Sequence, residues 1–442
     1  MLNAEEEESK EQIDTKKQID NDPTHTYQYD FYEPIERAYE WNSARLLEMI
    51  MGECQLLKRL ESMNHYFFFD RGDLFSHFYE SCGDILEKQS SDVKIEKLES
   101  CLEMAIRTSS ANSDPFKDDL TCELNGYGVS EQLFVTWITR GALGNKAFTN
   151  NVNPNNLKVG QSSGTLKVHE AFTLDYRVKW PLTLIISKKA INKYQLIFRH
   201  LLQCKYAEKY LENVWCSHQL FKECNVQSSL QLTYALRHRM LQFCKNYMYY
   251  MQIEVLEPNH HKLKQQLKKV KTVDEIIMLH SNFLDECLKE CLLTDQNLFR
   301  IITSINIRTL FFSRVIIRFF NNVKDEEIIE RARAGDDDID DEETKRVFGE
   351  KQLTSRLEKR RLQKEKESAL IKKNISENNY PTILENFEKK FDEYMKELLE
   401  LLAKQSKFET HIANLAQRLD FNGFYANKLL QGNNQGPAGD LL

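Results

Sequence analysis

Glycine and proline are scarce in this chain, which has 15 glycines and 8 prolines among its 442 residues. Together they form roughly 5% of the sequence, whereas about 12% is usual for the two residues in proteins. Tight turns depend on glycine for positive φ and on proline for a fixed φ. We therefore expect long helices, few strands, and little material for the glycine-rich loops that hold phosphate groups.

The composition is that of a folded protein with a mild negative charge. Hydrophobic residues make up 41% of the chain and the formal net charge is −7, so the overall electrostatic field does not favour nucleic acid as a partner. The ten cysteines are scattered and the N-terminus lacks a signal-peptide pattern, which predicts a cytosolic protein with reduced thiols. The most apolar stretch, 309–320, contains Arg314 and Arg318. It is too short to span a bilayer, so we expect no membrane insertion.

Most of the chain has apolar residues at three- and four-residue steps, which is the helical period. The ranges with this pattern are 31–63, 72–86, 94–107, 188–215, 230–255, 273–291, 298–323 and 384–401. Pro258 is expected to end the helix before it, with His260 and His261 in the following loop. These patterns predict an all-α fold built from elongated helical bundles.

One segment has the period of a strand instead. Between 165 and 187, apolar residues alternate with other residues at Phe172, Leu174, Tyr176, Val178 and Trp180. Pro181 should end this strand because it cannot donate a backbone hydrogen bond. We predict a short β-hairpin-like segment near 165–187. The stretch 109–128, rich in turn-forming residues, is expected to be a loop.

Three further segments carry too few apolar residues to form a core of their own. Residues 1–25 are expected to be a disordered acidic tail, and residues 431–442 a flexible tail. Residues 324–375 change from an acidic run at 336–343 to a basic run at 356–367. We expect them to form a charged insert, either disordered or a solvated single helix. A nuclear signal or a patch for an acidic partner is a further interpretation of the basic run.

No motif for catalysis, a cofactor or a metal is complete. The glycines of 126–128 lack the third glycine of a dinucleotide-binding fingerprint, and 141–146 lacks the spacing of a phosphate-binding loop. His280, Cys287 and Cys291 share one predicted helical face, where they could bind a metal or be buried core residues. Core burial is favoured because no recognised metal-ligand spacing accompanies them. We therefore expect no enzyme, no cofactor and no metal site, but a protein that presents helix faces to a partner.

Several stretches carry a resemblance to a known family. They are 66–78 (YFFFDRGDLFSHF), 110–120 (SANSDPFKDDL), 172–187 (FTLDYRVKWPLTLIIS), 194–204 (YQLIFRHLLQC), 236–258 (LRHRMLQFCKNYMYYMQIEVLEP), 283–294 (FLDECLKECLLT) and 418–425 (RLDFNGFY). In this order they resemble the C-terminal half of the gamma-tubulin complex components. The stretches 110–120 and 236–258 are most similar to the component 2 branch of that family.

The resemblance implies a helical scaffold whose C-terminal half holds one gamma-tubulin molecule. Family members pair, component 2 with component 3, and the pairs form a ring that templates microtubule nucleation at centrosomes and spindle poles. It thus implies gamma-tubulin and a component 3-like protein as partners, and a place in the cytoplasm and cytoskeleton at microtubule-organising centres. Another helical-rod assembly protein, such as a membrane-tethering subunit, is the alternative.

The resemblance also implies a division of the chain. In the family, a whole N-terminal half for lateral assembly precedes the first of these stretches, whereas only about 65 residues precede it here. Residues 26–64 are therefore expected to be the last helices of a mostly absent N-terminal half. Residues 65–430 are expected to be the gamma-tubulin-binding helical domain, interrupted by the insert at 324–375.

A helical scaffold leaves recognition to its irregular elements, so we look for gamma-tubulin contacts there. Tyr176, Arg177 and Lys179 in the strand segment are the first candidates, because tubulin family surfaces are acidic. The alternative is that this segment only caps a helical bundle.

Two further pairs of residues are candidate gamma-tubulin contacts. Arg237 and Arg239 are two positions apart on a predicted helix, so they cannot both face one partner squarely. Their alternative is solvent exposure or pairing inside the protein. Asp420 and Asn422 belong to the stretch RLDFNGFY, which either contacts the partner or docks the last helix.

Overall fold

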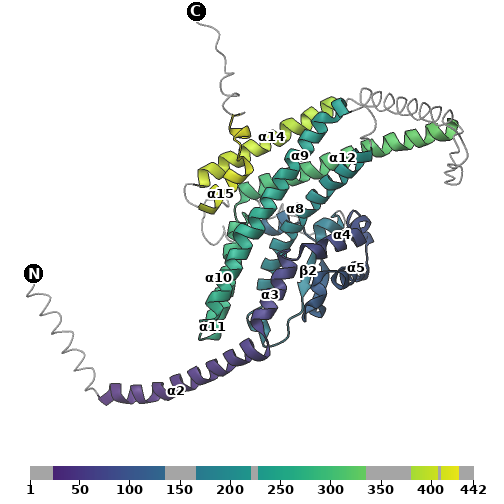
Figure 1. Cartoon of the computed structure of the whole chain (residues 1–442). Helices are drawn as coiled ribbons and strands as arrows, with labels where there is room; N and C mark the ends of the chain where they lie inside the picture. Colours follow the sequence, from purple (N-terminus) through teal and green to yellow (C-terminus); the bar gives the residue numbers. More distant parts are fainter. Residues whose placement is uncertain (1–22, 135–165, 221–226, 335–379, 407–409, 428–442) are drawn as a thin grey trace, which may run out of the picture.

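The computed structural model of the chain describes residues 23–134, 166–220, 227–334, 380–406 and 410–427 (Figure 1). Its helices are α2 (Pro23–Glu48), α3 (Leu56–Phe67), α4 (Gly72–Leu86), α5 (Ile95–Thr108), α7 (Val168–Ala171), α8 (Lys188–Leu220), α9 (Gln227–Tyr249), α10 (Glu257–Leu267), α11 (Val273–Glu290), α12 (Gln296–Ala334), α14 (Tyr380–Gln405) and α15 (Thr410–Leu419). π-Helical turns lie at η1 (Met49–Glu53) and η7 (Tyr250–Leu256). The expected all-α class is confirmed, with a two-stranded sheet as its β element.

Helix α8 is the central element of the helical body. It packs against α9, α11 and α12 and against strand β2 (Phe172–Tyr176), and residues 194–202 are all buried. A helical stretch that is buried on every side must be surrounded by other elements. Helix α2 is the opposite case, because it projects away from the body in Figure 1 and its residues 32–42 are exposed.

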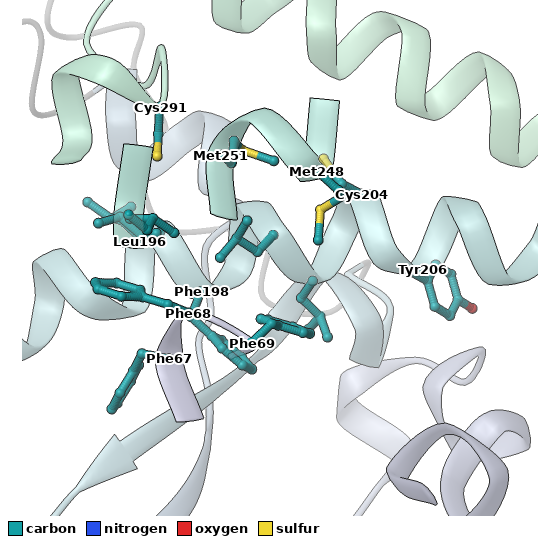
Figure 2. Close-up of a cluster of buried hydrophobic side chains, with 14 of the residues drawn as sticks. Phe67, Phe68, Phe69, Leu196, Phe198, Cys204, Tyr206, Met248, Met251 and Cys291 are labelled. Atoms are coloured by element: carbon teal, nitrogen blue, oxygen red, sulfur yellow. The ribbon is translucent and has the colours of Figure 1, made fainter. Parts of the chain in front are cut away.

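The corner between α3 and α4 is filled by three consecutive phenylalanines (Figure 2). The ring of Phe67 lies 5.5 Å from that of Tyr194, and the ring of Phe69 lies 5.3 Å from that of Phe198. Phe69 has a φ of 59°, which a bulky residue rarely adopts. Residues 66–69 therefore form a buried corner of the core.

The β element differs in detail from the expected hairpin. Strand β2 forms at Phe172–Tyr176 as expected, but it pairs antiparallel with β1 (Leu120–Leu124), with Leu120 opposite Tyr176. Strand β1 lies in the stretch that was expected to be a loop, and residues 125–171 separate it from β2, so the two strands are not joined by a tight turn. Pairing with a distant strand is decided by tertiary packing, which local alternation does not reveal.

The expectation that Pro258 ends a helix was wrong. The π-helical turn η7 follows α9 directly, and α10 starts at Glu257 with Pro258 in its first turn. Proline is tolerated in the first turn of a helical segment, where its missing N–H needs no acceptor, and the π-helical turn provides such a start. His260 and His261 are therefore helical residues.

The start of the predicted charged insert is helical. Helix α12 continues through 324–334, so these first residues of the predicted insert are helical. The remainder, 335–375, lies outside the described residues, as do 1–22 and 428–442 at the two ends. The expectations for those parts stay predictions.

Candidate partner-binding surface

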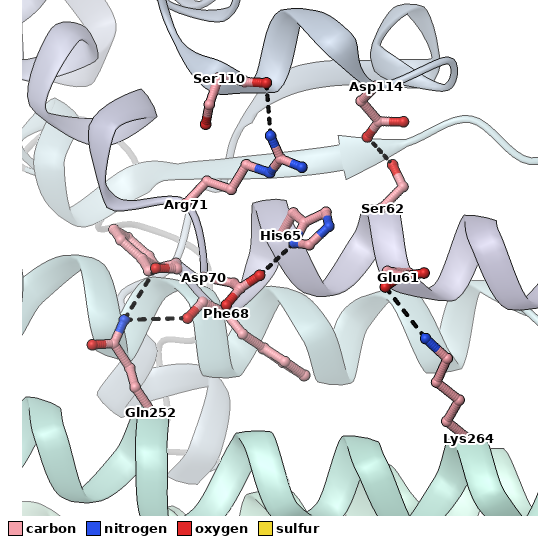
Figure 3. Close-up of polar contacts among 11 residues, drawn as sticks. Glu61, Ser62, His65, Phe68, Asp70, Arg71, Ser110, Asp114, Gln252 and Lys264 are labelled. Carbon is pink, nitrogen blue, oxygen red and sulfur yellow. Dashed lines mark hydrogen bonds and ion pairs between the residues drawn. The ribbon is translucent and has the colours of Figure 1, made fainter.

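A network of polar contacts fixes the loop before β1 onto α3 (Figure 3). The hydroxyl of Ser62 donates to the Asp114 carboxylate at 2.6 Å, and Arg71 donates to the backbone carbonyl of Ser110 at 2.7 Å. Arg59 forms an ion pair with Asp119 at 2.6 Å. The backbone carbonyl of Asp119 in turn accepts a hydrogen bond from the Arg177 amide at 2.8 Å. The point where the chain leaves β2 is thus held in place by α3.

The chain that leaves β2 forms an exposed basic and apolar surface. We call this the strand-exit surface, and it consists of Arg177, Lys179, Trp180, Leu184, Lys188 and Lys189, all of which are exposed. Trp180 keeps 74% of its surface accessible. Large exposed apolar side chains beside charged ones are typical of protein-binding sites.

Buried aliphatic residues anchor the strand-exit surface from below. Leu182, Ile185 and Ile186 are buried, while the two residues between them, Thr183 and Leu184, are exposed. No acidic residue occurs in 176–207. In the described part of the chain, Lys179, Lys188 and Lys189 have no ion pair or hydrogen bond from their ammonium groups. These lysines are consequently available to an acidic partner.

Arg177 and Tyr176 differ from the lysines. Arg177 borders an open groove of about 480 Å³ whose lining includes the acidic residues Glu99, Glu103 and Asp118 and the basic residues Arg107 and Lys117. Tyr176 is 1% exposed, and burial raises its pKa to about 12. The structure therefore separates Tyr176, a core residue, from Arg177 and Lys179 on the surface.

Arg237 points into the protein. Its guanidinium lies 4.8 Å from the centre of the Trp215 ring and 3.5 Å from the carbonyl of Leu211. Burial lowers its pKa. This residue is held internally between α8 and α9, as the alternative interpretation predicted.

Arg239 is a junction between α9, α14 and the last described turn. It forms an ion pair with Glu388 at 2.8 Å and a second one with Asp392, and it donates to the hydroxyl of Tyr425 at 3.3 Å. Burial opposes its charge, but Tyr425 and Asp392 together outweigh this and raise the pKa of the guanidinium. Arg239 is thus also paired inside the protein.

Asp420 and Asn422 shape the turn after α15. The Asp420 carboxylate accepts hydrogen bonds from the amides of Tyr425 at 3.0 Å and Ala426 at 2.9 Å, and the Asn422 side chain accepts one from the amide of Phe424 at 3.3 Å. Gly423 has a φ of +65°, which favours glycine. The stretch therefore forms a closed turn, and Arg239 of α9 contacts it through the Tyr425 hydroxyl. Phe421 remains 83% exposed beside it.

Sequence reasoning thus located the strand-exit surface but not all of its residues. Trp180, Leu184, Lys188 and Lys189 were not among the candidates. The signal that could have found them is the run of 32 residues, 176–207, without an acidic side chain. Their exposure could not be read from the sequence, because Trp180 and Leu184 have the same apolar character as their buried neighbours.

The possible metal ligands are core residues. Cys287 and Cys291 are buried, and burial raises the pKa of each thiol. The His280 Nε2 lies 3.1 Å from the Tyr194 hydroxyl. The favoured interpretation, core burial, is confirmed. Within the described ranges, no group of three His, Cys, Asp or Glu residues could hold a metal ion.

None of the described helices combines the length and apolar character required to cross a bilayer.

Four buried histidines should make stability depend on pH. Burial lowers the pKa of His169, His200, His218 and His280 from 6.5 to about 4. The fold therefore holds them neutral, and this stability is complete above pH 6.5 and lost as pH falls toward 4. We expect the melting temperature to drop from pH 7 to pH 5, with a loss on the order of 1 kcal/mol per histidine. Equal melting temperatures at both pH values would contradict the burial of these four histidines in their neutral form.

The comparisons with known proteins agree with the resemblance. A family profile described as "Gamma tubulin complex component C-terminal" matches residues 56–425. Gamma-tubulin complex component 2 of Mus musculus is 35% identical over 414 residues, covering 90% of this chain and 43% of the mouse protein. Gamma-tubulin complex component 2 of Arabidopsis thaliana is 36% identical over 264 residues, 60% of this chain and 37% of the plant protein. Spindle pole body component alp4 of Schizosaccharomyces pombe is 33% identical over 302 residues, 60% and 38% of the two chains.

These matches define the class of protein. The chain belongs to the gamma-tubulin complex component family, because the profile covers most of its length. Its similarity to component 2 of two organisms supports the branch expected from the sequence. The chain spans less than half the length of these relatives.

Proposed function

We propose that this chain binds gamma-tubulin through its helical domain and holds it in a template for microtubule nucleation. The names of its relatives, which are gamma-tubulin complex components, support this proposal. The observation that carries it is the strand-exit surface, where Trp180 and Lys179 lie on an anchored loop and Lys188 and Lys189 lie in the first turn of α8. Within the described part of the chain, none of these three lysines has an ion pair. Tubulin family surfaces are acidic, so such a loop is electrostatically complementary to them.

Stiffness of the body is the second requirement of a template. Holding subunits at a fixed spacing removes part of the entropic cost of forming a nucleus. The body is built around α8 with 33 residues and α12 with 39 residues, which pack against each other. A loop fixed to such helices would place its bound partner in a defined orientation.

The partners and location follow from the same proposal. We expect a component 3-like protein as a further subunit, supported by the similarity to Gamma-tubulin complex component 3 homolog of Xenopus laevis, 24% identical over 272 residues. We expect a location at microtubule-organising centres in the cytoplasm, supported by the spindle pole body name of the fission yeast relative. The membrane-tethering alternative has no support from the family match.

Co-sedimentation of the purified chain with purified gamma-tubulin tests the proposal. We expect the two proteins to migrate together in a sucrose gradient at low salt and to separate progressively as salt is added, because screening weakens exposed charge pairs. Lipid vesicles, offered in a parallel gradient, should not carry the chain. Separate migration from gamma-tubulin at every salt concentration would contradict the proposed function.

A further inference from the structure

A groove between α4, α8 and α12 is lined by none of the residues of the strand-exit surface. It has a volume of about 560 Å³, within the range of ligand-binding pockets. Tyr206 and Tyr210 of α8 belong to its lining, and their hydroxyls are 3.1 Å apart. Since α4 and α12 both pack near this part of α8, they form the two walls of the groove.

The α12 wall is basic, and one of its hydrogen-bond donors has no acceptor. Arg314 and Arg318 are one helical turn apart and both line the groove. The Arg314 guanidinium lies 5.7 Å from the centre of the Tyr210 ring, and its Nη2 is buried without a hydrogen-bond partner. In the described part of the chain, neither arginine forms an ion pair with a carboxylate. A buried donor without an acceptor is costly, and an incoming carboxylate would satisfy it.

The α4 wall has the opposite charge. Glu80, Asp84 and Glu87 line this side of the groove and are exposed. Across the described residues, none of them reaches Arg314 or Arg318 closely enough to form an ion pair. The groove therefore keeps an acidic wall and a basic wall apart, and both remain open to a ligand.

The two walls together define the chemistry of the occupant. A polyanion such as nucleic acid or polyphosphate would be repelled by the α4 wall, and a polycation by the α12 wall. An extended peptide points successive side chains to opposite sides, so alternating acidic and basic residues would face the matching walls. We propose that this groove binds an extended segment of a partner protein with alternating acidic and basic residues, whose carboxylates pair with Arg314 and Arg318.

A fluorescence-anisotropy titration with a short labelled peptide of alternating glutamate and lysine tests this proposal. We expect the full chain to bind this peptide more tightly than an all-glutamate peptide or an all-lysine peptide. Replacing Arg314 and Arg318 with alanine should weaken binding about tenfold for each arginine removed. Arg300→Ala is the matched control, because Arg300 is an exposed arginine of α12 that pairs with Glu397 outside the groove.

A second variant tests the proposal without replacing the half-buried Arg314, whose loss could disturb the fold. Asp84→Lys with Glu87→Lys changes only exposed side chains, and it should weaken binding of the alternating peptide while strengthening binding of the all-glutamate peptide. Equal binding of the alternating peptide by all variants would overturn the proposal. Tighter binding of the all-glutamate peptide, or of inorganic polyphosphate, to the unmodified chain would also overturn it.

Discussion

Replacing Arg239 with alanine is expected to lower the free energy of unfolding by about 3 kcal/mol, the lower end of the range for breaking a buried ion pair. The change removes the Arg239 ion pairs with the buried Asp392 and the half-buried Glu388. It also removes the guanidinium that contacts Tyr425. Helices α9 and α14 and the turn after α15 therefore lose the side chain that joins them. Urea unfolding followed by circular dichroism measures the effect.

Two comparisons separate this ion-pair effect from general damage. Arg300→Ala removes an exposed arginine from an ion pair with Glu397 and should cost less than about 1 kcal/mol. The double variant Arg239→Met with Asp392→Leu replaces both charges with apolar groups and should recover part of the loss. A loss for Arg239→Ala no greater than that for Arg300→Ala would contradict the assigned role.

Reversing the charge of Lys179, Lys188 and Lys189 to glutamate is expected to weaken gamma-tubulin binding on the order of 100-fold. The lysines have no ion pairs in the described part of the chain, so folding should be nearly unaffected. The loss comes from like charges placed opposite an acidic partner. A separate Trp180→Ala variant should cost roughly 2 kcal/mol of binding free energy, as expected for an anchoring tryptophan.

The chain offers a matched control for this variant. Lys389 and Lys390 are adjacent exposed lysines on α14, remote from β2 in Figure 1. Their reversal to glutamate changes the net charge in the same direction but should leave gamma-tubulin binding within about twofold of the unmodified chain. If both sets of reversals weaken binding equally, the effect is one of net charge and the strand-exit surface has no special role.

Local patterns predicted the helices well because each helix buries a stripe of its own residues. The period at 273–291 corresponds to α11 (Val273–Glu290), where Ile276, Leu284 and Cys287 are all buried. The alternation at 172–176 likewise marks a real strand. In both cases the information lies within a few turns or residues of sequence.

Features set by distant contacts were not predictable in the same way. Strand β1 pairs with residues about 50 positions away, and its own sequence, LTCEL, is too short to stand out from a loop. The role of Arg239 depends on Glu388 and Asp392, which are 149 and 153 positions away. The prediction from their two-residue spacing, that Arg237 and Arg239 face different directions, is confirmed. Arg237 faces α8, whereas Arg239 faces α14.

The structure distinguishes buried from exposed candidate binding residues, which the sequence alone did not. Tyr176, Arg177 and Lys179 are close together in sequence, yet Tyr176 is a core residue and the other two are exposed. Asp420 and Asn422 use their side chains to form a turn. Polar residues in an irregular segment therefore serve structure or recognition according to which backbone groups they reach.

Hydrogen exchange of the chain, alone and bound to gamma-tubulin, tests the central claim most directly. The account predicts that backbone amides within 177–189 exchange more slowly in the complex, while those of α14 around Lys389 and Lys390 are unchanged. Protection that is confined to other elements, with 177–189 exchanging at the same rate in both states, would contradict it.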